Sequence, residues 1–384
     1  MQVYLDNSAT TKMSNAAADL VTKVSTIDYG NPSSLHRMGV EAERCVKAAA
    51  LEIAKTLHCQ EKEIVFTSGG TESNNLAIIG AAMANRRAGS HIITTAIEHP
   101  SVQNAVKHLE EEGFEVTRLG VNEYGEISLD ELAGAIRDDT ILISVMMINN
   151  EMGALEPVEK AGKLIHEKNP DILFHVDAVQ AYGKCRINPK KMGIDLLSVS
   201  AHKIHGPKGV GFLYIRDKAK VRPITYGGGQ QRDMRSGTIN APGIAGFGEA
   251  VREIFKAPEA NAEKMYELKE HFIHRLSALE GVRINGREGR ESAPHIVSAV
   301  FSGVKSEVLL HALEDKEIFV SAGSACASGH PADSTTLPAI GLDSSQQEST
   351  LRFSFSIHTT AQELDYTADA LAELLPVLRQ YRRR

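Results

Sequence analysis

One cysteine of this chain stands in a stretch made almost entirely of small residues. Cys326 lies in "SAGSACASGHP", among Ser, Ala and Gly, and not among the large apolar side chains that usually surround a free thiol. Such a cysteine is often incidental, because a free thiol behaves as a small hydrophobic group. The placement also suits a nucleophile on a movable segment. That interpretation requires a second site, elsewhere in the chain, that supplies an electrophile.

Three other motifs place reactive groups at the ends of predicted strands. "TSGGTESNN" brings two glycines and Thr71 to a strand-to-helix junction, where backbone N–H groups bind anions, although a merely capped helix start has the same pattern. "FHVDAVQ" puts Asp177 at the end of an apolar strand, where a buried carboxylate needs a cationic or hydrogen-bonding partner. "SVSAHKIHGPKG" puts Lys203 after the following strand. A single lysine at that position, without the other motifs, would be interpreted as a solvent-exposed residue at the end of a strand.

Together these motifs offer what pyridoxal 5'-phosphate requires of a protein. The cofactor needs a phosphate site, a partner for its pyridinium nitrogen and an amine for a Schiff base. The glycine-rich turn, Asp177 and Lys203 match these needs in turn. Each signal is weak alone, and their combination is what makes the cofactor a specific prediction.

The periodicity of the chain predicts the elements that position these motifs. Helices are expected over 39–58, 72–87, 101–112, 128–137 and 157–168, and strands within 63–70, 91–97, 115–121, 140–149, 171–179, 196–202 and 210–216. This alternation predicts a mostly parallel sheet with helices on both faces. Ligands of such sheets bind at the carboxyl ends of the strands.

The rhythm changes after about Gly248. A long helix is expected over 261–281, followed by strands within 293–301, 318–323 and 351–356 and by helices over 306–316 and 364–381. This mixture indicates a separate, smaller α/β unit. The glycine-rich "YGGGQQRDMRSGT" is too short for an interdomain linker and reads as a functional loop.

Composition narrows the class of protein. The chain has 384 residues, 42% of them apolar, and a net charge of −7, which argues against nucleic acid or an anionic membrane as the main partner. No apolar run is long enough to span a bilayer, so no membrane association is expected. The four cysteines show no CxxC spacing and no secretory leader is apparent, which favours a cytoplasmic location. The histidines show no metal-ligand spacing, and no metal site is expected.

From Tyr4 to Arg352 the chain resembles the cysteine desulfurases of the NifS/IscS type, which are class-V aminotransferase-like, fold-type I pyridoxal-phosphate enzymes. The matching stretches are "YLDNSATT", "GNPSSLHRMG", "EIVFTSGGTESNNLAI", "EHPSV", "NNEMGAL", "HVDAVQ", "SAHKIHGPKGVG", "MRSGT", "SAGSACAS" and "RFSFS". The resemblance implies a large cofactor-binding domain over 15–255 and a small C-terminal domain over 256–384 that carries the Cys326 loop. It also implies that the N-terminal segment 1–14 packs with the small domain.

The resemblance implies roles for the residues around the cofactor ring. Lys203 would be the Schiff-base lysine and Asp177 the partner of the pyridinium nitrogen. Gln180 would donate to the ring hydroxyl. His99 would stack over the ring and serve in proton transfer.

Further roles follow from the same resemblance. The cofactor phosphate would be bound by Gly70, Thr71, Ser200 and His202, and by Thr238 of the other subunit of a homodimer. The substrate carboxylate would be held by Asn150 and Arg352, whose guanidinium suits a bidentate contact.

The expected reaction converts L-cysteine to L-alanine and leaves a persulfide on Cys326. The sulfur would then pass to an acceptor or scaffold protein, for iron–sulfur cluster assembly, tRNA thiolation or another pathway. Three alternatives are a selenocysteine lyase, an aminotransferase and a non-catalytic sulfur-carrier or scaffold protein. Cys326 argues against the first two, and the complete set of cofactor residues argues against the third.

Overall fold

The structure, a computed structural model, describes residues 1–322 and 334–380. Its larger sheet consists of β2 (Ile64–Thr67), β3 (His91–Thr95), β4 (Glu115–Leu119), β5 (Thr140–Met146), β6 (Leu173–Asp177), β7 (Leu196–Ser200) and β8 (Gly211–Ile215). These seven strands follow the order β2-β8-β7-β6-β5-β3-β4. All neighbouring pairs are parallel except the two that involve β8, which runs antiparallel to both β7 and β2. The predicted fold class, a mostly parallel sheet in a fold-type I arrangement, is confirmed.

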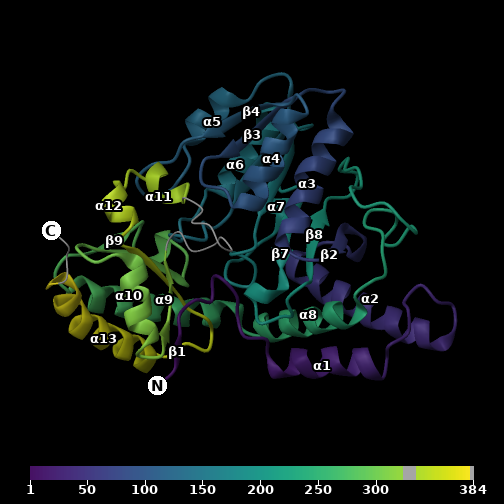
Figure 1. The fold of residues 1–384 in the computed structure, drawn as a ribbon. Helices are drawn as coiled ribbons and strands as arrows, with labels where there is room; N and C mark the ends of the chain where they lie inside the picture. The colour runs from purple at the N-terminus through teal and green to yellow at the C-terminus, as the bar shows by residue number, and fades with distance from the viewer. Residues whose placement is uncertain (323–333, 381–384) are drawn as a thin grey trace.

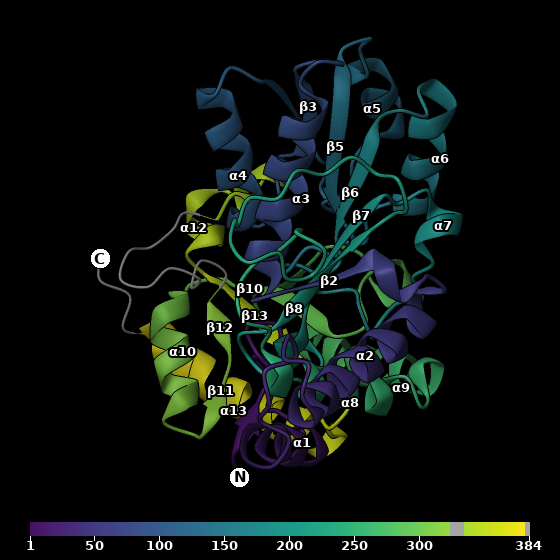
Figure 2. The same ribbon diagram turned by 90° about the vertical axis from the view of Figure 1, so that its right-hand side faces the viewer.

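Helices cover both faces of this sheet. They are α3 (Gly70–Asn85), α4 (Pro100–Glu111), α5 (Leu129–Ala135), α6 (Val158–Lys168) and α7 (Pro189–Met192). Helices α3 and α4 lie on one face, and α5, α6 and α7 lie on the other (Figure 2). Successive strand residues point to opposite faces, so Ile92 packs in the core beneath α3 and α4 while Ile93 packs in the core on the other side. Burial on both faces explains why central strands such as β5 and β6 are rich in apolar residues, whereas the edge strand β4 is partly exposed and contains charged residues.

A smaller unit is built around a four-stranded antiparallel sheet. It contains β9 (Val282–Asn285), β10 (Ile296–Phe301), β12 (Ser321–Ala322) and β13 (Thr350–Ser354), in the order β12-β13-β10-β9. Its helices are α9 (Pro258–Ser277), α10 (Ser306–Glu314) and α13 (Ala361–Gln380), with the short α11 (Thr336–Ala339) and α12 (Ser344–Gln347). Phe272, Phe301 and Phe353 form aromatic contacts in its core. This unit lies beside the larger sheet (Figure 1).

The N-terminal residues return to the smaller unit. Strand β1 (Val3–Tyr4) pairs in parallel with β11 (Ile318–Phe319), and Asp6 forms a parallel bridge with Ser354. The predicted boundaries between segments 1–14, 15–255 and 256–384 remain a prediction.

Five helices of the described residues were not predicted. Three of them are the short α7, α11 and α12, and the other two, α1 (Asn15–Thr26) and α8 (Ala241–Ile254), pack with α2 (Arg37–Leu57). Helix α8 contains three glycines, which normally disfavour a helix. A Cβ at Gly248 would lie 2.7 Å from the Cβ of Ala49 on α2, and one at Gly246 would lie 2.5 Å from Val21 of α1. The glycines therefore allow close helix packing, a requirement that periodicity cannot reveal. In the described part of the chain, no helix is both long and apolar enough to cross a membrane.

Candidate active site

Strand register brings the predicted motifs to one edge of the larger sheet. Gly211 of β8 pairs with Thr67 at the end of β2 and with Ser200 at the end of β7. Asp177 ends β6 and pairs with Ser198 of β7. Three segments that are distant in sequence therefore finish side by side, as expected for a ligand site at the carboxyl ends of strands.

A cavity of about 320 Å³ opens at this edge. Its lining includes every predicted site residue of the described chain except Thr238, namely Gly70, Thr71, His99, Asn150, Asp177, Gln180, Ser200, His202, Lys203 and Arg352. Thr238 is exposed in the glycine-rich loop, and Cys326 lies outside the described residues. Lys203 and Asp177 thus border one common space, as their proposed roles require.

Asp177 has the hydrogen-bonding partners that its burial demands. The residue is 6% exposed, and its carboxylate accepts hydrogen bonds from the Asn74 side chain at 2.7 Å and from the Val179 backbone N–H at 2.9 Å. Asn74 also donates to Ser101 Oγ, while its own Oδ1 has no partner within the described residues. The sequence analysis did not identify Asn74, although it lies one helical turn after Gly70 in the quoted "TSGGTESNN".

Lys203 follows β7 in a short 3-10 helix, and the N-terminal segment holds its amine. Its Nζ donates to the backbone carbonyls of Ser8 and Ala9, the latter at 2.8 Å. The same segment contacts the neighbouring histidine, because Thr10 Oγ1 lies 3.2 Å from His202 Nδ1 and Thr11 Oγ1 donates to the His202 carbonyl. The quoted "YLDNSATT" stretch therefore forms one wall of the cavity.

The imidazoles of His99 and His202 favour their neutral forms. Burial lowers the pKa of His99, and the positive charge of Lys203 lowers it further, although Asp177 opposes the shift. Burial also lowers the pKa of His202 to about 4, with smaller contributions from Lys203, Lys208 and Lys184. His99 caps the start of α4 through Nδ1, which fixes the orientation of its ring. A neutral imidazole can accept a proton or hydrogen-bond to a ligand.

The start of α3 provides an anion cradle. Gly69 adopts a φ of 148°, and the first turn of the helix has no side-chain cap. A Cβ at Gly70 would lie 2.7 Å from the side chain of Val179, so any other residue at this position would force a shift of that side chain. Thr71, Ser200 and His202 line the same cavity as Gly70. Free N–H groups at a helix N-terminus, with hydroxyl donors nearby, form a phosphate site.

Gln180 has a fixed orientation. Its Nε2 donates to the Ser8 carbonyl at 2.9 Å, and its Oε1 lies 3.3 Å from His295 Nε2. Burial holds the pKa of His295 well below its usual range, so the ring is neutral and donates from Nε2. The second N–H of the Gln180 amide remains available to a ligand in the cavity.

Arg352 extends from β13 in the smaller unit into the cavity. Its side chain is 4% exposed; one Nη donates to the Asn150 carbonyl at 2.8 Å and the other pairs with Asp6 at 2.8 Å. Its Nε has no partner within the described residues. A buried guanidinium with an unsatisfied donor suits an anionic ligand, and a carboxylate matches its geometry.

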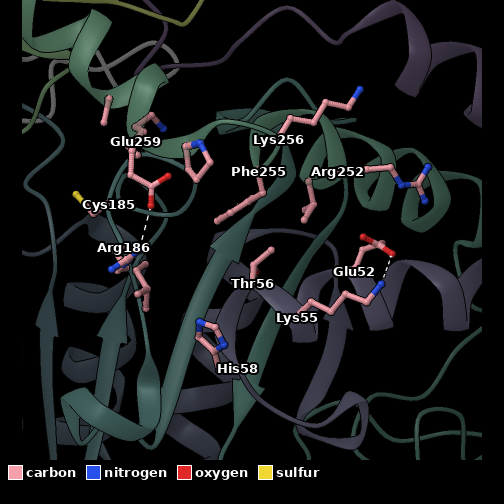
Figure 3. Close-up of a pocket in the computed structure, with 16 residues that line it drawn as sticks. Glu52, Lys55, Thr56, His58, Cys185, Arg186, Arg252, Phe255, Lys256 and Glu259 are labelled. Atoms are coloured by element: carbon pink, nitrogen blue, oxygen red, sulfur yellow. Dashed lines mark hydrogen bonds and ion pairs between the residues drawn. The ribbon is translucent and has the colours of Figure 1, made fainter.

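A larger cavity of about 790 Å³ lies elsewhere, between the end of α2 and the start of α9. Its rim is charged, but Lys55 pairs with Glu52 and Arg186 with Glu259 (Figure 3). None of the predicted site residues lines it. We therefore assign the chemistry to the smaller cavity. The described residues contain no group of three or more His, Cys, Asp or Glu side chains that could hold a metal ion.

Comparison with known families identifies the chain. The sequence pattern of the family described as "Aminotransferase class-V" matches residues 3–367. The chain belongs to this family.

Curated relatives align with almost the whole of this chain. The cysteine desulfurase IscS of Clostridium botulinum (strain Hall) is 42% identical over 382 residues, which cover 99% of this chain and 96% of that protein. The mitochondrial cysteine desulfurase of Candida albicans is 41% identical, with 98% of this chain and 78% of that protein covered. The resemblance to cysteine desulfurases of the NifS/IscS type is thereby confirmed.

Solved structures agree with this assignment. A structure titled "NIFS-LIKE PROTEIN" matches with a TM-score of 0.93 and 36% identity, covering 98% of this chain and all of that one. Another, titled "SspA in complex with cysteine", matches with a TM-score of 0.82 and 34% identity, covering 94% and 100%. The class-V aminotransferase fold therefore extends over nearly the whole chain.

Proposed function

We propose that this protein is a cysteine desulfurase that uses pyridoxal 5'-phosphate to convert L-cysteine to L-alanine, with a persulfide formed on Cys326. The observation that carries the proposal is a single cavity that gathers the Lys203 amine, the Asp177 carboxylate and the uncapped start of α3. Relatives named cysteine desulfurase, 41–42% identical over nearly the full length, support the reaction type.

The residues around the cavity fit the cofactor. Lys203 supplies the amine for covalent attachment, and Asp177 supplies a carboxylate for the ring nitrogen. The cradle of Gly70, Thr71, Ser200 and His202 suits the phosphate, and the second N–H of Gln180 suits the ring hydroxyl. Asn74 donates a hydrogen bond to the Asp177 carboxylate, which restricts the orientation of that carboxylate.

The cofactor, when bound, supplies an electron sink for negative charge that develops on the substrate carbons. The protein supplies proton carriers and a binding site. His99 is neutral near pH 7, because burial lowers its pKa, and it can therefore accept a proton beside the ring. Arg352 and Asn150 both line the cavity, and they hold the carboxylate of the amino acid.

Sulfur transfer needs a nucleophile, and we assign that role to Cys326 from its motif. The thiolate attacks the sulfur of L-cysteine, a sulfur–sulfur bond forms, and the carbon–sulfur bond breaks with its electron pair passing to the substrate carbon. Protonation of the carbon that has lost its sulfur then leads to L-alanine. The small residues "SAGSACAS" around Cys326 suit a segment that then presents the persulfide to an acceptor.

A homodimer is part of the proposal. Thr238 is exposed in this chain and does not line its own cavity, which supports a role at the phosphate of a second copy. The sulfur acceptor or scaffold protein and a cytoplasmic location are likewise proposed, and a relative from Candida albicans is named as mitochondrial.

Absorbance and product assays test the function. The purified protein should show the visible absorbance of bound pyridoxal phosphate and should release sulfide and alanine from L-cysteine in the presence of a thiol reductant. Cys326→Ala should keep the absorbance and lose persulfide formation. Cys45→Ala, which removes a half-buried thiol on α2, is the matched control and should keep both properties.

Two outcomes would contradict the proposal. Full desulfurase turnover by Cys326→Ala would exclude that residue as the nucleophile. Transamination of L-cysteine without release of sulfide would favour an aminotransferase instead.

A further inference from the structure

We propose that Asp6 is a positioning residue that fixes the Arg352 guanidinium for the α-carboxylate of the amino-acid substrate; the inference rests on the proposed function. Asp6 Oδ1 lies 2.8 Å from Arg352 Nη2, and the two side chains are 22% and 4% exposed. Asp6 does not line the cavity, whereas Arg352 does. The carboxylate therefore acts on the substrate only through the arginine.

The contacts of Arg352 leave a defined set of donors for a ligand. Asp6 holds one Nη, and the Asn150 carbonyl holds the other at 2.8 Å. The Nε–H has no partner within the described residues. Because both Nη groups are held, the side chain cannot rotate without breaking two charge-assisted hydrogen bonds. The Arg352 side chain has therefore already lost its conformational entropy before the substrate binds, and binding does not incur this loss again.

Asp6 also compensates the charge of a buried cation. An arginine almost fully removed from water is costly without an anionic partner. Glu151 is also close enough to interact electrostatically with Arg352, but burial raises the pKa of Glu151 and its Oε2 accepts from Ser334 Oγ at 2.5 Å. Among the described residues, Asp6 forms the ion pair with Arg352.

Backbone pairing ties Asp6 to the strand that carries the arginine. Ser354, two residues beyond Arg352 on β13, donates from its backbone N–H to the Leu5 carbonyl at 2.6 Å. The Asn7 N–H donates to the Ser354 carbonyl at 3.3 Å, and the Asn7 side chain donates to the same carbonyl at 2.9 Å. These bonds on either side of Asp6 set the distance between its carboxylate and the guanidinium.

The experiment measures how strongly the protein distinguishes a carboxylate. L-alanine and ethylamine differ only in the carboxylate, and neither carries sulfur. Their binding to the cofactor-loaded protein is followed by the change in cofactor absorbance. Asp6→Asn removes the charge at nearly constant volume, and Asp6→Ala removes the whole group in case the asparagine retains a hydrogen bond. Loss of a charged hydrogen bond should weaken L-alanine binding by about tenfold or more, with ethylamine affected less than about twofold.

A matched control removes another arginine–aspartate pair. Asp365→Asn disrupts the surface pair with Arg275, neither residue of which lines the cavity, and both affinities should be unchanged. For L-cysteine, the Asp6 variants should show a higher KM with little change in kcat, because the carboxylate contact exists before and during the reaction.

The outcomes separate the inference from the proposed function. Equal weakening of L-alanine and ethylamine would overturn the inference, since it would show a general structural role for Asp6. Unchanged L-alanine binding in both variants would also overturn it. A third outcome combines two results: the wild-type protein releases no sulfide from L-cysteine, and the Asp6 variants no longer bind L-alanine in preference to ethylamine. In that case the proposed function fails and the positioning role of Asp6 is supported.

Discussion

His175 should make the strand that carries Asp177 sensitive to acid. Its ring is fully buried on β6, where one nitrogen bonds Ser144 Oγ at 2.8 Å and the other bonds Ser198 Oγ at 2.9 Å. Burial lowers the pKa of His175 from 6.5 to about 3. The two hydroxyls thus connect the neighbouring strands β5 and β7 through a neutral imidazole.

The sign and size of the effect follow from this pKa. In the unfolded chain the imidazole takes up a proton below about pH 6.5, whereas the folded protein resists protonation until about pH 3. The unfolded state binds more protons in this window, so the free energy of unfolding falls as the pH drops through it. Between about pH 7 and pH 5, His175 alone should lower the free energy of unfolding by about 2 kcal/mol.

Urea unfolding at about pH 7 and pH 5 measures this effect. His175→Asn keeps a small polar side chain between the two serines but cannot titrate, and His175→Gln serves if the asparagine variant does not fold. We expect either variant to be less stable than wild type at about pH 7, so the test compares the loss of unfolding free energy between about pH 7 and pH 5. This loss should be smaller in the variant than in wild type by about 2 kcal/mol. His108→Asn, at an exposed position of α4, should leave the change unaltered. An identical pH dependence in wild type and the His175 variants would refute the reasoning.

Three further predictions concern the cavity. Lys203→Ala should abolish the visible absorbance of covalently bound cofactor, as measured by the spectrum of the purified protein. Thr238→Ala should raise the dissociation constant of pyridoxal phosphate about tenfold, through loss of one hydrogen bond to a charged group, as measured by equilibrium dialysis; an unchanged constant would count against the shared phosphate site. Asn74→Ala should reduce sulfide release about tenfold, because Asp177 loses a charged hydrogen bond, whereas Asn75→Ala, which removes a bond within α3, should not.

Local sequence patterns were sufficient where structure follows from local chemistry. Short apolar runs predicted central strands of the larger sheet such as β5 and β6, because these strands are buried on both faces. The change of rhythm after Gly248 predicted the smaller unit. Helix α8 was missed, because its glycines serve packing against α1 and α2 and conceal its periodicity.

The sequence predicted some residues of the candidate site and missed others. Motifs at strand ends pointed to Asp177 and Lys203, since parallel strands present their carboxyl ends together. Asn74 was missed although it lies in the motif "TSGGTESNN". The local sequence does not show that an asparagine on α3 donates a hydrogen bond to a carboxylate 103 positions later. The role of Cys326 still rests on its motif.

The sequence by itself determined the alternation of strands and helices in the larger sheet, the chemical groups at the strand ends and the resemblance to a family. The tertiary structure decided which partners those groups have. Asp6 and Arg352 are 346 positions apart, and Gln180 and His295 are 115 apart, yet each pair lies within contact distance. Such contacts depend on how the N-terminal segment and the smaller unit pack against the larger sheet. No local pattern encodes that packing, because it results from the burial of surfaces contributed by the whole chain.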